Sequence, residues 1–209
     1  MARSPAAKRN LTRERIAHLA ARLIAEDGVH DYGLAKRKAA QQIGAPDTRN
    51  LPNNAEVEQA LRAFRALYQS DEHPELLREL RLAALAAMDW LAAFDPQLSG
   101  SVLNGTAGRY ADVNLQLQAE SVKDVEYFLM RENVSYRSGE RRQSHGGAVR
   151  SLPTFSLVRD GVPLTLTVYS PGDPRGPARG ADGEPLRARA PYLRSLIDEP
   201  PESGSTADY

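Results

Sequence analysis

The sequence predicts an α+β protein in which a helical N-terminal part is packed on a small mixed sheet. Apolar residues recur at helical spacing over roughly the first 95 positions, and the period changes to two after that point. An Asp-Gly pair at 160–161 joins two such alternating segments, which is a strong signal for a β-hairpin. We therefore expect a helical subdomain over 1–95, a sheet domain over 96–198 and a disordered acidic tail over 199–209.

Four helices are expected in the first part. The first has its apolar residues at i, i+3, i+4, i+7 and i+8, with Thr12 placed to cap it and Gly28 to end it. The second ends at Gly44, and an irregular connection follows over 46–54. Asn53 and Glu56 have the spacing of a capping box that opens a third helix. The fourth runs from Pro74 to about Phe94 and is apolar nearly all round, which predicts a helix buried between the two halves.

The second part reads as strands interrupted by short helices. Alternation is clearest where Val113, Leu115 and Leu117 are interleaved with polar residues. A helix is expected over 122–129 and another over 192–197, with a mobile Pro-, Gly- and Arg-rich loop over 171–185. The expected strands are 98–103, 112–118, 134–137, 153–159 and 162–170.

Composition excludes several classes of protein. The chain has 209 residues, 27 basic against 27 acidic side chains, and no cysteine. This balance gives no overall attraction to nucleic acid, and the lack of thiols excludes disulfides and Cys-type zinc sites. No secretory signal is visible, and the most apolar run, 80–94, is too short to cross a membrane. We expect a cytoplasmic protein without a membrane partner.

One short stretch has the pattern of a phosphate-transfer site. Gly100-Ser101 is followed by the apolar-flanked Asp112-Val113-Asn114. Residues two apart in a strand point to the same face, so Asp112 and Asn114 are expected to point together as catalytic positions, with Asp112 as a metal ligand. A glycine-containing turn lets phosphate approach the backbone, which makes four residues candidates for nucleotide binding: Gly100, Ser101, Gly105 and Thr106.

From Gly100 to Leu115 the sequence resembles the minimal nucleotidyltransferase domain, and the order of elements up to Ser170 agrees with it. The resemblance implies a nucleoside triphosphate held at the turn and Mg²⁺ held by strand carboxylates. It also implies a third acid on a later strand, where this chain has Thr165 and Thr167. The chain is similar as a whole to a bacterial nucleotidyltransferase-like family of unassigned function. We therefore predict a nucleotide- or phosphate-binding protein whose catalysis is impaired because Asn114 and threonine replace acids.

Arginines of the second part are further candidates for phosphate binding. Arg141 and Arg142 are expected to act as a phosphate clamp within a basic cluster between two strands. The P-loop alternative fails, because Thr106-Ala107 stands where Lys-Ser/Thr is required.

The rival function is a nucleic-acid-binding regulator that uses the basic N-terminal helices. Residues 23–28 are similar to the first helix of TetR-type repressors, and Lys36-Arg37-Lys38 follows on the next helix. After Gly44, however, prolines stand where a recognition helix should begin. A structural interaction module is the third possibility.

Overall fold

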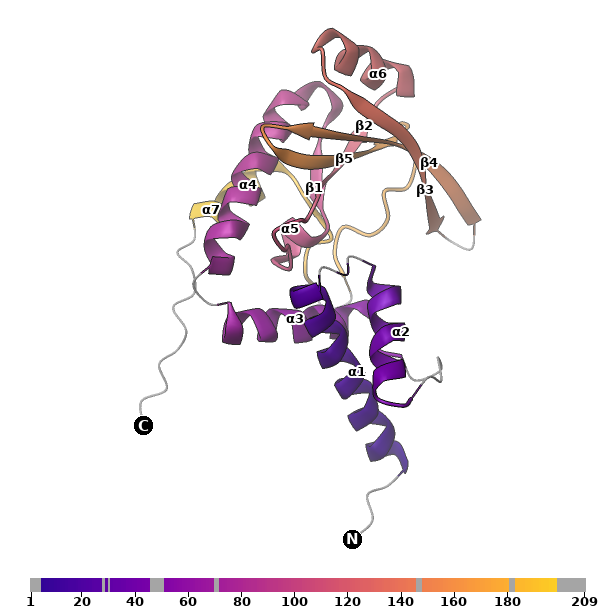
Figure 1. Ribbon diagram of the computed structural model, residues 1–209. Helices are drawn as coiled ribbons and strands as arrows, with labels where there is room; N and C mark the ends of the chain where they lie inside the picture. Colours follow the sequence, from indigo (N-terminus) through magenta and orange to yellow (C-terminus); the bar gives the residue numbers. More distant parts are fainter. Residues whose placement is uncertain are drawn as a thin grey trace. The chain divides into compact units, whose positions relative to one another are not determined.

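The computed structural model describes residues 5–27, 29, 31–45, 51–69, 72–145, 148–180 and 183–198, and it confirms the α+β class. The chain forms two compact units, shown with their elements in Figure 1. The helical unit comprises residues 1–75 with 108–110, and the sheet unit comprises 76–107 with 111–209. The boundary expected near residue 95 lies at 75, because the fourth helix contributes Leu80, Ala84 and Met88 to the core of the sheet unit.

The helical unit contains α1 (Pro5–Asp27), α2 (Tyr32–Gln42) and α3 (Asn54–Tyr68). Its core is built from small and branched side chains, including Ile16, Ala35, Val57 and Leu61. The predicted capping box is confirmed. The Asn53 side chain accepts from the Glu56 N–H at 2.8 Å, and the Glu56 carboxylate accepts from the Asn53 N–H at 2.6 Å.

A six-stranded mixed sheet with the order β3-β4-β5-β2-β1-β6 forms the second unit. The pair β2–β5 is parallel and the other four pairs are antiparallel. Among the described residues the strands are β1 (Gln97–Ser99), β2 (Val113–Gln118), β3 (Tyr136–His145), β4 (Ala148–Arg159), β5 (Val162–Tyr169) and β6 (Arg187–Ala188). The helices are α4 (Glu72–Trp90), the 3-10 turn η2 (Ala92–Phe94), α5 (Ser101–Asn104), α6 (Val122–Arg131) and α7 (Ala190–Asp198).

One face of this sheet is apolar and the other is polar. Val113, Leu115 and Leu117 of β2 are buried together with Leu164 and Leu166 of β5, and α4, α6 and α7 supply the side chains that cover them. The alternate residues of the same strands form the opposite face, which we call the polar face. It carries Asn114, Gln116, Gln118, Thr165, Thr167 and Tyr169.

Several predicted elements need correction. The strand expected over 98–103 ends at Ser99, because Gly100 turns the chain with φ 77° and α5 follows. The strands expected over 134–137 and 153–159 are longer and pair as one hairpin, seen at the edge of the sheet in Figure 1. The arginine cluster expected between these strands therefore lies on them. Strand β6 was not predicted, whereas the Asp160-Gly161 hairpin is confirmed, with φ 51° and 80°. The predicted tail, 199–209, lies outside the described residues.

Across the described residues, no helix has the length and apolar character that crossing a membrane requires.

We predict that Glu56→Gln destabilises the helical unit in a pH-dependent way. Arg13 donates to both Glu56 oxygens, at 2.7 and 2.6 Å, and this pairing lowers the pKa of Glu56. The contribution is therefore complete above the unfolded-state pKa of about 4.3 and disappears as pH falls through the lower folded-state pKa. Because both side chains are more than a third exposed, we expect a loss of about 0.5–1 kcal/mol at pH 7. Urea denaturation followed by circular dichroism at pH 7 and pH 3 measures it. A difference that does not change with pH would contradict the ion-pair assignment, since glutamine retains an oxygen for the cap.

Candidate functional site

The polar face ends in a small cluster around Asp112. Asn114 of β2 is the direct register partner of Thr165 of β5. The Thr165 hydroxyl donates to the Asp112 carboxylate at 3.1 Å, and the Asn114 amide donates to the Asp112 carbonyl at 3.0 Å. Asp112, Asn114 and Thr165 are thus neighbours, and they present a carboxylate, an amide and a hydroxyl.

Gly100 lies beside this cluster. A Cβ built at Gly100 would stand 3.4 Å from the Asn114 Nδ2 atom, so the Gly100 backbone lies directly against the Asn114 side chain. Ser101 follows as the first residue of α5. The turn and the cluster therefore meet because β1 pairs with β2, with Ser99 opposite Asn114.

Gly105 and Thr106 have a different place from Gly100 and Ser101. Gly105 ends α5 in the left-handed conformation and faces Leu77 and Arg81 of α4. Thr106 is buried, and both its N–H and its hydroxyl donate to the Asn104 side chain. These two residues therefore terminate α5 and pack it on α4, while Gly100 and Ser101 form the part of the turn near Asp112.

Strand register places a row of polar side chains across the whole sheet at the level of Asn114. In the order of the strands from β3 to β6 the row is Arg137, Ser156, Thr165, Asn114, Ser99 and Arg187. Arg137 and Ser156 also line an open pocket of about 730 Å³ with Asp112. Its remaining walls are largely apolar, with Val134, Leu157, Val158, Pro163 and Leu164 among the lining residues. The volume of this pocket lies within the range of small-molecule sites, although the pocket is open to solvent.

Arg141 and Arg142 do not act as a pair. Adjacent residues of β3 point to opposite faces, so Arg141 lies on the polar face and Arg142 on the other side of the strand. Arg141 is four residues beyond Arg137, about 13 Å along the strand. The arginine that lines the pocket together with Asp112 is therefore Arg137, which the sequence analysis did not assign to the site. The Gly146-Gly147 pair is a hairpin signal that would have given the register and with it Arg137.

The donor set at Asp112 fits Mg²⁺ poorly. Within the described residues, no group of three or more His, Cys, Asp or Glu side chains is arranged to hold a metal ion. Magnesium sites in proteins draw on carboxylates together with substrate phosphates, and here the two neighbours of Asp112 contribute no charge.

The basic side chains of the helical unit are partly neutralised where the structure describes them. Arg13 pairs with Glu56, and Arg22 pairs with Glu26 at 2.7 Å. Lys36 donates to Asn54 at 2.9 Å. The two arginine pairs neutralise part of the positive charge of the helical unit, whereas the bond to Asn54 leaves the charge of Lys36 in place.

Comparisons with known family models, with curated proteins and with solved structures give no match.

We predict that Gly100→Ala costs about 1–3 kcal/mol in folding free energy, because its backbone (φ 77°, ψ −155°) lies in a region that is essentially restricted to glycine. Gly105→Ala is the control and should cost less, since φ 78° and ψ 13° form the left-handed region that other residues enter at a cost of about 1–2 kcal/mol. Denaturant unfolding of both variants gives the comparison. Equal losses would mean that the Gly100 turn is not held in this conformation in solution.

Proposed function

We propose that this protein binds a nucleotide or a related phosphate ester at the Asp112 end of the polar face, and that its ability to transfer a nucleotidyl group is impaired. The observation that carries the proposal is the meeting of Gly100, Asp112, Asn114 and Thr165, which come from three separate segments of the chain. These residues are the ones that carry the sequence resemblance to nucleotidyltransferases, in the same order along the chain.

The lining of the pocket supports a ligand with an apolar body and an anionic group. Arg137 supplies a guanidinium that can pair with phosphate. The Gly100 backbone lies against the Asn114 side chain at the edge of the Asp112 cluster. Apolar side chains from β4 and β5 supply a surface for a base or another flat group. Hydroxyls of Ser135 and Ser156 add hydrogen-bonding capacity.

Impaired transfer follows from the charge at the three central positions. Nucleotidyl transfer by metal ions requires ligands that hold two cations against the triphosphate. Asp112 contributes one negative charge, and the Thr165 hydroxyl already donates to it. Binding without efficient turnover is the function that this donor set supports best.

Arg137→Gln is expected to weaken binding of a nucleoside triphosphate by about tenfold, because a charge-assisted hydrogen bond contributes about 1.5–3 kcal/mol. Isothermal titration calorimetry with ATP in the presence of magnesium measures the affinity. Arg142→Gln is the matched control: it removes the same charge from the same strand but on the opposite face, and its affinity should equal that of the wild type. If ATP up to millimolar concentration gives no heat, or if the two variants lose affinity equally, the proposal fails.

The double variant Asn114→Asp with Thr165→Glu is expected to create a magnesium site. Both positions adjoin Asp112, so the added carboxylates repel it and lower the melting temperature of the metal-free protein. Magnesium at about ten times its Kd should restore about 1.4 kcal/mol, because it binds only the folded state.

Thermal melting with and without magnesium tests this, with the two single variants as controls that should respond less. If magnesium does not change the melting temperature of the double variant, the side chains at positions 112, 114 and 165 do not face one another.

A further inference from the structure

A second group of polar side chains lies at the opposite end of the polar face from Asp112. Tyr169 ends β5 and Gln118 ends β2, and the two are register partners. Gln118 is six residues beyond Asp112, about 20 Å at the rise of a β-strand. We call the group formed by Arg141, Gln143, Tyr169 and Arg175 the arginine cradle. The Arg187 side chain reaches this group from the level of Asn114.

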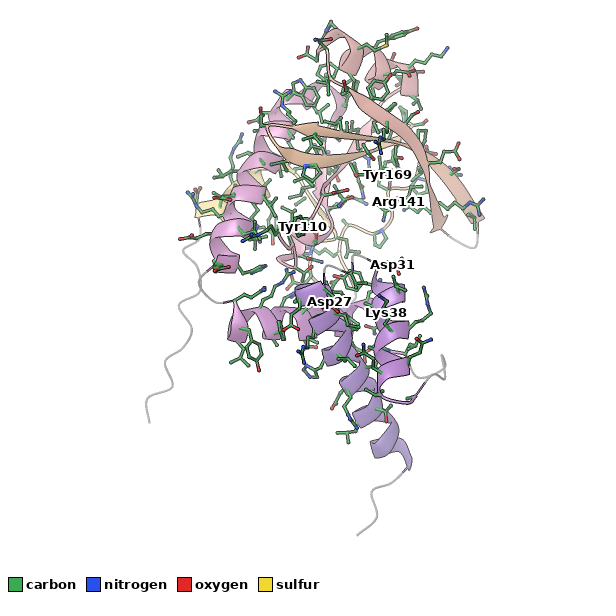
Figure 2. The ribbon with its side chains drawn as sticks, viewed as in Figure 1. Asp27, Asp31, Lys38, Tyr110, Arg141 and Tyr169 are labelled. Atoms are coloured by element: carbon green, nitrogen blue, oxygen red, sulfur yellow. The ribbon has the colours of Figure 1, made fainter. Side chains whose placement is uncertain are left out.

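Tyr169 is the centre of the cradle. Its hydroxyl donates to the Gln143 Oε1 atom of β3 at 2.8 Å, so the tyrosine side chain spans β4. The charges of Arg141, Arg175 and Arg187 each act on the Tyr169 hydroxyl and lower its pKa, although burial is the larger effect and raises it overall. Figure 2 labels Arg141 and Tyr169 and shows them close together on the sheet.

The segment that follows β5 packs against the strands of the cradle and contributes Arg175 to it. The Arg175 side chain is only 9% exposed; it donates to the Gln118 Oε1 atom at 3.0 Å and lies 5.9 Å from the centre of the Tyr169 ring. Arg187 is held by donation to the carbonyls of Arg175 and Gly176, at 2.9 and 2.6 Å. Gly176 adjoins Gln143, since a Cβ there would stand 3.5 Å from the Gln143 Nε2 atom.

Positive charge exceeds negative charge in this group. Asp95 is shared by Arg175 at 3.6 Å and Arg189 at 2.5 Å. Within the described residues, Arg141 has no carboxylate within ion-pair distance and no hydrogen-bond partner. Burial lowers the pKa of Arg175 most, and repulsion from Arg187 and Arg189 lowers it further. Asp95 raises this pKa but offsets the electrostatic cost only in part. An anion seated among these arginines would offset that cost.

Two hydrogen-bond donor groups of the cradle, on Gln143 and Arg141, suit a phosphate. Because Gln143 Oε1 accepts the Tyr169 hydrogen, the Gln143 amide presents its NH₂ group as a donor. Arg141 offers a planar guanidinium that matches two phosphate oxygens. We infer that the arginine cradle is a phosphate-binding site, separate from the Asp112 pocket, with Arg141 and Gln143 as the residues that contact the anion.

This inference does not depend on nucleotide binding at Asp112, because it concerns different residues. The phosphate can belong to a free small anion or to a single-stranded nucleic acid that lies along the polar face. The two sources share the chemistry of the cradle and differ in size and in salt dependence.

The test uses the full chain as wild type, Arg141→Gln, Arg142→Gln and Tyr169→Phe. The two arginine variants remove the same charge at adjacent exposed positions, but only Arg141 is in the cradle. Tyr169→Phe keeps every charge and removes the hydroxyl that orients the Gln143 amide. The probes are pyrophosphate, followed by calorimetry, and a fluorescent six-nucleotide single-stranded RNA, followed by anisotropy at several salt concentrations.

We expect Arg141→Gln to weaken binding of at least one probe by about tenfold and Tyr169→Phe to weaken it by a smaller factor. Arg142→Gln should bind as the wild type does. An effect on pyrophosphate assigns the site to small anions, whereas an effect on RNA alone, with affinity that falls steeply with salt, assigns it to a nucleic-acid strand. The inference is overturned if pyrophosphate at about 10 mM and the RNA at about 100 µM both fail to bind, since these are about the weak limits of such sites. It is also overturned if Arg141→Gln and Arg142→Gln have equal effects. The Arg137→Gln comparison with ATP fails or succeeds independently of these results.

Discussion

The parallel pairing of β2 with β5 is the constraint on which the candidate site depends. Its register sets Asn114 against Thr165 and brings the Thr165 hydroxyl to the Asp112 carboxylate. A shift by one residue would turn Thr165 into the core and bring Leu164 or Leu166 to the polar face. The buried leucines and valines of the apolar face therefore hold the site indirectly, because they make any other register costly in hydrophobic burial.

The local signals in the sequence predicted much of this architecture. The capping box at Asn53 and the Asp160-Gly161 hairpin were both readable, because a few residues determine each of them. The alternation of β2 placed Asp112 and Asn114 together. The turn into α5 was read wrongly, since Val102 and Leu103 form a short apolar run that suits a strand or a buried helix equally well. Strand β6 has only two residues and carries no periodic signal.

The remainder of the site depends on contacts between residues distant in sequence. Arg137 comes to the level of Asn114 only through the registers of three strand pairs, which no single segment encodes. The separation of Arg141 from Arg142 follows from strand parity, once the strand expected to end at Arg137 is seen to continue to His145. Gly105 and Thr106 fit a phosphate turn by composition alone, and their contacts with Leu77 and Asn104 show that they shape α5. The polar face thus carries two separated groups of side chains, one around a carboxylate and one around arginines, about 20 Å apart.

Amide and side-chain resonances of the isotopically labelled protein, followed by NMR during titration with a nucleoside triphosphate, test the central claim most directly. The account predicts saturable shifts at the Asn114 side-chain amide, at the backbone amides of Gly100 and Ser101, and at Thr165. Residues of α1 to α3 should not move. Shifts confined to those helices, or an Asn114 signal that stays unchanged while other residues respond, would contradict the assignment of the site to the Asp112 end of the polar face.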